Sequence, residues 1–135
     1  TFGIVQFGSE SAGSKRRLVG IYNSGSYLFA LNLWGATATT TTSASTTPTI
    51  FGSTMSNTGA ANLFSNGKLN TSANLTTIAS LTTPAPIEIG RAQSGGSAQY
   101  YLTGDIMEIL IYNSVISEND RKKIEAYLNA KYKAY

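Results

Sequence analysis

Short apolar runs, separated by segments rich in glycine, serine and asparagine, recur through most of the chain. Runs of this length with turn residues between them predict strands rather than helices. Residues 27–34 alternate so that both faces are partly apolar, which predicts an inner strand of two packed sheets. Residues 35–48, rich in threonine, fit either an edge strand or a loop. The expected strands are residues 2–7, 18–23, 27–34, 50–55, 62–65, 68–71, 87–89 and 100–112, the last broken near Gly104.

The dipeptide Asn66-Gly67 separates two of these runs and is the sharpest local signal in the chain. Both central residues of a type I′ turn need a positive φ, which asparagine and glycine adopt most readily. The dipeptide therefore predicts a hairpin that joins residues 62–65 to residues 68–71.

A helical pattern is found at the C-terminal end. Ser117 with Asp120 three residues later is similar to a capping box, with aspartate in place of the preferred glutamate. After it, apolar residues recur at helical spacing and form one stripe, which we expect to pack against the sheets. The stripe consists of Ile124, Tyr127, Leu128, Tyr132 and Tyr135. Strands followed by one terminal helix predict an antiparallel β-sandwich.

Composition narrows the possible chemistry. Charged residues make up 13% of the chain, about half the usual share of roughly 25%. The chain has no cysteine and no histidine, which excludes thiolate catalysis, Ser-His-Asp triads and Cys- or His-ligated metals. Between Arg17 and Glu88 the only charged side chain is Lys68. Few charges oppose edge-to-edge pairing there, so we expect this region to be covered by other chains in an oligomer or by further parts of its own chain.

The basic residues gather near the C-terminus, where acidic residues are mixed among them. This mixture is typical of a solvated helix face, and no nucleic-acid partner is predicted. The apolar runs are far shorter than the ~20 residues of a membrane helix, so no membrane partner is predicted either.

Several motifs follow one another in a distinctive order. They are NLFSNG at 62–67, PIEIGR at 86–91, LTGDIMEILIYN at 102–113, ISENDR at 116–121 and IEAYLNAKY at 124–132. Together they resemble the laminin-G-like, concanavalin A-like lectin/glucanase jelly-roll family over residues 60–135. The resemblance implies an all-β fold: an antiparallel β-sandwich (jelly roll) with one C-terminal α-helix. We expect a single domain over residues 1–135. Because relatives commonly have strands ahead of the position of Phe2, a fragment lacking N-terminal strands is left open.

The resemblance supports the fold and says little about the ligand, and glycan binding is a functional interpretation that rests on the residues themselves. Sugar sites commonly combine an aromatic face with amide or hydroxyl groups. Trp34, the only tryptophan, shares a strand face with Asn32, and Tyr22 lies nearby in the sequence; Tyr101 follows a glycine-rich loop. These four are the predicted ligand-binding residues, acting through a polar and aromatic surface rather than through charge. The alternative for Trp34 is a place in the core.

No catalytic residue is predicted. Glycan hydrolysis needs two carboxylates about 5–10 Å apart near the scissile bond, whereas Asp105 and Glu108, three positions apart, would point to opposite faces of a strand. Glu108 is interpreted as a carboxylate held by hydrogen bonds beside the helix or a turn. We predict no cofactor and no metal site. Calcium stays an alternative because jelly-roll domains often bind it, although Met107 stands where many relatives carry aspartate.

Three function classes remain in view. The favoured one is a non-enzymatic structural or adhesion module of a surface assembly, such as a phage fibre, decoration or receptor-binding protein of the virion, that can bind glycans. The alternative is a carbohydrate-binding module of a secreted bacterial protein. A glycan-active enzyme is disfavoured because the carboxylate pair is missing. The expected partners are glycans and other virion or surface chains, and the expected location is the virion surface or the extracellular space.

Overall fold

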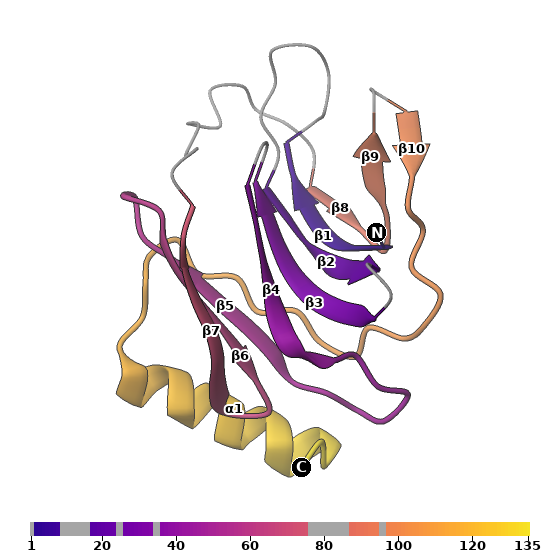
Figure 1. Ribbon diagram of the computed structural model, residues 1–135. Coiled ribbons are helices and arrows are strands. Elements are labelled where there is room, and N and C mark those ends of the chain that lie inside the picture. Colours follow the sequence, from indigo (N-terminus) through magenta and orange to yellow (C-terminus); the bar gives the residue numbers. More distant parts are fainter. Residues whose placement is uncertain (1, 9–16, 24–25, 34–35, 76–86, 95–96) are drawn as a thin grey trace.

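The computed structural model describes residues 2–8, 17–23, 26–33, 36–75, 87–94 and 97–135. Two antiparallel sheets and one helix dominate this part of the chain (Figure 1). The five-stranded sheet has the order β4-β3-β2-β1-β8, and the three-stranded sheet has the order β5-β6-β7. The described residues therefore form an antiparallel β-sandwich with a C-terminal helix, which confirms the predicted fold class.

The strands of the larger sheet are β1 (Phe2–Phe7), β2 (Arg17–Asn23), β3 (Tyr27–Leu33), β4 (Ala36–Ser43) and β8 (Ile87–Ile89). Those of the smaller sheet are β5 (Phe51–Met55), β6 (Ala60–Ser65) and β7 (Lys68–Asn74). A short hairpin of β9 (Ala92–Ser94) and β10 (Ser97–Gln99) follows β8, and α1 (Glu118–Tyr132) comes last. The threonine-rich run, which the sequence left ambiguous, is thus largely a strand.

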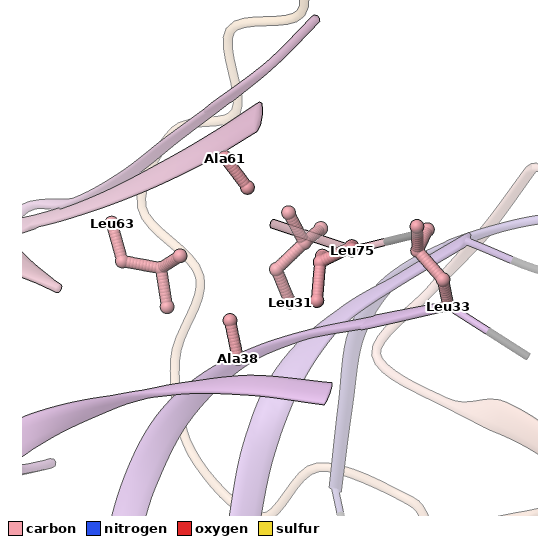
Figure 2. Close-up of a cluster of buried hydrophobic side chains, with 6 residues drawn as sticks. All are labelled: Leu31, Leu33, Ala38, Ala61, Leu63 and Leu75. Atoms are coloured by element: carbon pink, nitrogen blue, oxygen red, sulfur yellow. The ribbon is translucent and has the colours of Figure 1, made fainter. Parts of the chain in front are cut away.

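The core lies where the two sheets face each other. Side chains on alternate positions of a strand share a face, so Leu31 and Leu33 of β3 both point toward the smaller sheet. In Figure 2 they lie in one cluster of buried side chains with Leu75 and with Leu63 of β6. Burying each leucine contributes about 1.5–3 kcal/mol relative to leaving it exposed. The buried cluster consists of Leu31, Leu33, Ala38, Ala61, Leu63 and Leu75.

Polar groups join the sheets along the edge strand β4. The Thr41 backbone N–H donates to Asn70 Oδ1, and Asn70 Nδ2 donates to Thr42 Oγ1 over 2.9 Å. Thr71 Oγ1 donates to the Thr39 carbonyl over 2.8 Å. Side chains of β7 therefore satisfy backbone groups that an edge strand would otherwise leave open.

The hairpin prediction is confirmed. Asn66 and Gly67 have φ values of 48° and 79°, as a type I′ turn requires. Ser65 pairs with Lys68 and Asn62 pairs with Ser72, with one irregularity in register between these two pairs. The extra residue on β7 lies between Leu69 and Thr71, the partners of Phe64 and Leu63.

The prediction of a long strand over residues 100–112 is wrong. No strand is assigned from Tyr100 to Ser117. Tyr100 and Leu102 each form one backbone hydrogen bond, to Gly3 and Gly90, and the chain then runs to the helix. A strand needs a partner edge whatever its β-propensity. In this segment the Met107 carbonyl and the Glu108 carboxylate bond instead to side chains of α1. Large apolar side chains of this segment also stay outside the core, since Met107 and Ile111 are each about half exposed.

The helix begins as predicted, but two residues of its expected polar face are enclosed. The Ser117 hydroxyl accepts the Asp120 N–H over 3.1 Å and donates to the Asp120 carboxylate over 2.7 Å, which forms the capping interaction. The residue of α1 that is fully buried is Glu125, and Tyr127 of the apolar stripe is 47% exposed. The sequence places Arg121 and Glu125 on the solvated polar face, and this is wrong, because both are enclosed under the β6–β7 hairpin. Of the apolar stripe, Ile124, Leu128 and Tyr132 are half-buried.

The apolar side of the helix instead holds Glu108, as the interpretation of that residue anticipates. Tyr132 Oη donates to the Glu108 carboxylate over 2.9 Å, and Lys131 Nζ approaches it at 3.1 Å. These two donors, Lys131 first, hold the pKa of Glu108 below its ordinary value of 4.5. Hydrogen bonds with the Tyr127 hydroxyl, the Glu108 carboxylate and the Tyr132 hydroxyl raise the pKa of Lys131.

Two strand glycines give a test of packing. A methyl group on Gly3 of β1 would overlap the backbone of Arg91 and Ala92, whereas one on Gly52 of β5 would meet Phe64 Cβ at an ordinary 3.7 Å. We predict that Gly3→Ala lowers the free energy of unfolding by about 1–3 kcal/mol, and that Gly52→Ala changes it by less than about 1 kcal/mol. Denaturant unfolding measures both. Equal effects of the two substitutions would contradict this packing.

Glu108 gives a test of pH dependence. Its pKa is lower in the folded chain than in the unfolded chain, so it stabilises the fold above pH 4.5 and this contribution is lost as the pH falls through the folded-state value. Glu108→Gln should therefore reduce stability at pH 7 and flatten the loss of stability below pH 4.5. Urea unfolding from pH 7 to pH 3 measures both, with Asp105→Asn as the control. A mutant curve parallel to the parent curve would refute the assignment.

Candidate functional site

An open depression of about 420 Å³ lies between the β6–β7 turn and the helix. Figure 1 shows this turn lying over α1. One wall comes from the hairpin and the other from one face of the helix and the residues after it. We call this depression the hairpin–helix groove; its lining residues are Asn66, Gly67, Lys68, Lys122, Glu125, Ala126, Asn129 and Tyr135.

The hairpin wall is held firmly by a neighbouring strand. The Ile50 N–H donates to Asn66 Oδ1 and the Asn66 N–H donates to the Ile50 carbonyl, each over 2.9 Å. Gly67 carries no side chain, which lets the helix side approach closely: a methyl group there would come within 2.7 Å of the Tyr135 hydroxyl. The turn is thus fixed before any ligand arrives, and its glycine leaves room for Tyr135.

The floor of the groove contains a buried ion pair. Glu125 is 6% exposed, and its Oε2 accepts from Arg121 Nη1 over 2.6 Å. The Arg121 guanidinium lies 3.9 Å above the centre of the Phe64 ring of β6, which fixes it by a cation–π contact. Because a buried carboxylate needs a paired charge, Arg121 is what allows Glu125 to lie under the hairpin.

The helix wall presents amide and aromatic groups. Lys133 adopts a left-handed conformation (φ 52°) and ends the helix, so that the chain turns back along it. The Tyr135 N–H then donates to Asn129 Oδ1 over 2.9 Å, which places Tyr135 beside Gly67. The amide nitrogen of Asn129 has no partner among the described residues and can donate to a ligand.

The two lysines of the groove differ in their pairing. Lys122 Nζ lies 2.8 Å from Glu118 Oε1, one helical turn away. Lys68, the first residue of β7, has no charged partner among the residues that the structure describes. The groove therefore joins an aromatic ring, amides and one uncompensated ammonium group.

Three of the residues proposed from the sequence, Tyr22, Asn32 and Tyr101, do not line this groove. Tyr22 pairs with Leu28 and Asn32 pairs with Leu18, so the two are four positions apart along the sheet, roughly 13 Å at 3.3 Å per residue. Asn32 Nδ2 already donates to Thr37 Oγ1. Tyr101 is 60% exposed and follows Tyr100, which bonds to β1. Trp34 lies outside the described residues, so its role as ligand or core residue stays a prediction.

Sequence reasoning missed most of the groove although two signals pointed to it. Lys122, Glu125, Ala126 and Asn129 recur at helical spacing and so share one face of α1. The Asn66-Gly67 turn was recognised, but only as a local element. What the sequence could not supply is the packing of that turn on that face.

The two buried carboxylates of the described residues are bonded to neighbouring side chains. Glu88 Oε1 accepts from Arg91 over 2.9 Å and from Gln93 over 2.7 Å, while Glu125 is paired with Arg121. Within the described ranges no group of three or more acidic side chains is placed to hold a metal ion. The same residues contain no helix long and apolar enough to cross a membrane.

Comparison with known proteins identifies a family. A laminin-G-type family model, described as the concanavalin A-like lectin/glucanases superfamily, matches residues 2–120. The match covers the strands, the β6–β7 turn and the start of α1, and it confirms the resemblance drawn from the sequence motifs. No curated protein and no solved structure gives a significant match to the chain.

The ion pair under the groove predicts unequal effects of two adjacent substitutions. Arg121→Ala leaves Glu125 buried without a partner, and we expect it to lower the free energy of unfolding by about 3–5 kcal/mol. Lys122→Ala breaks a pair whose side chains are 63% and 71% exposed, and we expect at most about 1 kcal/mol. Thermal or urea unfolding of the two variants compares them directly. A loss in Arg121→Ala no larger than that in Lys122→Ala would contradict the packing of the helix.

Proposed function

We propose that this chain, which belongs to the concanavalin A-like lectin/glucanases superfamily, is a carbohydrate-binding, adhesion-type module without catalytic activity. The family supports a carbohydrate-binding or adhesion role, and a fold alone does not choose a ligand. The choice of site therefore has to come from the chemistry of particular residues.

The observation that carries the proposal is the hairpin–helix groove. A pyranose offers an apolar patch, which an aromatic ring can cover, and hydroxyl groups, which amides can bind. Tyr135 supplies a ring that is 56% exposed, and Asn129 supplies an amide group beside it. Asn66 is already bonded to Ile50, so its part is to hold the hairpin wall in place.

The absence of catalysis is proposed from the state of the buried carboxylates. An acid/base pair would need two carboxyl groups facing one sugar. Glu125 lines the groove, but its charge is compensated by Arg121 at 2.6 Å. Glu88, the other buried carboxylate, belongs to β8 of the larger sheet. The groove thus supports binding better than bond cleavage.

The setting of the module is also a proposal. We place it in a surface assembly, at the virion surface or in the extracellular space, where it would act with other copies or chains. The support is compositional: 13% charged residues, no cysteine and strands rich in threonine, serine and asparagine. A carbohydrate-binding module of a secreted protein would use the same groove.

A screen of neutral and acidic oligosaccharides tests the proposed function, followed by titration calorimetry of each hit. We expect Tyr135→Ala to weaken binding about three- to tenfold, because the stacking contribution of a ring is about 0.5–1.5 kcal/mol. Tyr101→Ala is the matched control, since the two tyrosines are similarly exposed at 56% and 60%. Circular dichroism confirms that each variant is folded.

Three results would speak against this proposal. A folded protein that binds no oligosaccharide in the screen would refute carbohydrate binding. Loss of binding in Tyr101→Ala with normal binding in Tyr135→Ala would move the site to the segment that follows β10. Loss of binding in a folded Trp34→Ala variant alone would move the site to the residue that the sequence favoured.

A further inference from the structure

We infer that the hairpin–helix groove selects saccharides that carry a carboxylate, and that Lys68 is the residue that reads this group. The inference rests on the proposed function, because it names the ligand class of the same groove. It departs from the sequence-based expectation of a contact made through polar and aromatic groups without charge.

The position of Lys68 is the first observation. It is the only charged residue between Arg17 and Glu88, a region that otherwise relies on hydroxyl and amide groups for its polar surface. The type I′ turn places it directly after Gly67, at the start of β7, where it lines the groove. Its register is fixed by pairing with Ser65 across the hairpin.

Charge balance in the groove is the second observation. Glu125 at the floor is neutralised by Arg121 at 2.6 Å, and Lys122 at the rim is paired with Glu118 at 2.8 Å. Lys68 has no acidic partner among the described residues, so one positive charge remains uncompensated. An ammonium group in that state attracts an anionic group of the ligand.

The other groups of the groove match the other parts of an acidic sugar. Tyr135 offers a ring for the apolar patch of a sugar, and Asn129 offers an amide for its hydroxyl groups. Lys68 borders the same depression and would meet a carboxylate on that sugar. A uronic acid combines all three features in one residue.

The experiment compares two ligands that differ in a single group: a uronic-acid oligosaccharide and its carboxyl-reduced, neutral counterpart. Calorimetry with the whole chain measures both affinities. An exposed ion pair contributes about 0.2–1 kcal/mol, so we expect the acidic ligand to bind about two- to fivefold more tightly. Because salt screens such pairs, the preference should shrink as sodium chloride is raised.

Two variants of equal net charge separate a local effect from a general one. Lys68→Gln should abolish the preference, so that this variant binds the acidic and the neutral ligand with equal affinity. Lys123→Gln removes the same charge from an exposed position outside the groove lining, and it should keep the preference. Lys68→Arg should retain the preference, since the charge stays in place.

The outcomes distinguish this inference from the proposed function. Equal affinity of the two ligands, or a preference that survives in Lys68→Gln, overturns the role of Lys68 and leaves carbohydrate binding standing. A preference lost in both Lys68→Gln and Lys123→Gln also overturns it, because the effect would then be one of net charge. Binding of neither ligand, in a screen that also finds no other saccharide, overturns both proposals.

Discussion

The register of the β6–β7 hairpin is the constraint on which the rest of the molecule depends. Leu63 is completely buried, and a shift of pairing by one residue would turn it from the core to the other face of the sheet. The positive φ angles of Asn66 and Gly67 set that register, and the two hydrogen bonds between Asn66 and Ile50 tie it to β5. The same turn forms one wall of the groove, so core and site share one local cause.

The sandwich is held together with few charges, and hydroxyl and amide groups take their place. Asn70 bonds to both Thr41 and Thr42, and Thr71 bonds to the Thr39 carbonyl, so the smaller sheet closes the β4 edge of the larger one. Such side-chain bonds have directional requirements and stay effective when salt rises, unlike surface ion pairs. Low charge density therefore fits this architecture and gives Lys68 an isolated position.

Features that depend on neighbouring residues could be predicted from the sequence, and features that depend on distant partners could not. The Asn66-Gly67 turn and the Ser117 cap are decided within a few residues, and both were found. The apolar residues of 100–112 have high β-propensity, but no strand of the described part receives them. The helix face was misjudged because Arg121 and Glu125 look solvent-facing until their ion pair and the Phe64 ring are seen together. The groove arises from this packing of the helix on the hairpin. The sequence therefore could not show that its lining residues lie together.

The two buried carboxylates show how the fold separates structural from functional charge. Glu88 lies in β8 and bonds to Arg91 and Gln93, which binds the segment of β9 to the larger sheet. Glu125 lies at the floor of the groove. Among the described residues, its side chain bonds to Arg121 alone. A buried ion pair adds little net stability compared with apolar side chains of the same volume, so stability does not explain why a charged pair occupies that floor. Its consequence is electrostatic: the paired floor neither repels an anion nor offers a free base. The selectivity that we propose therefore rests on Lys68, whose ammonium group has no acidic partner among the described residues.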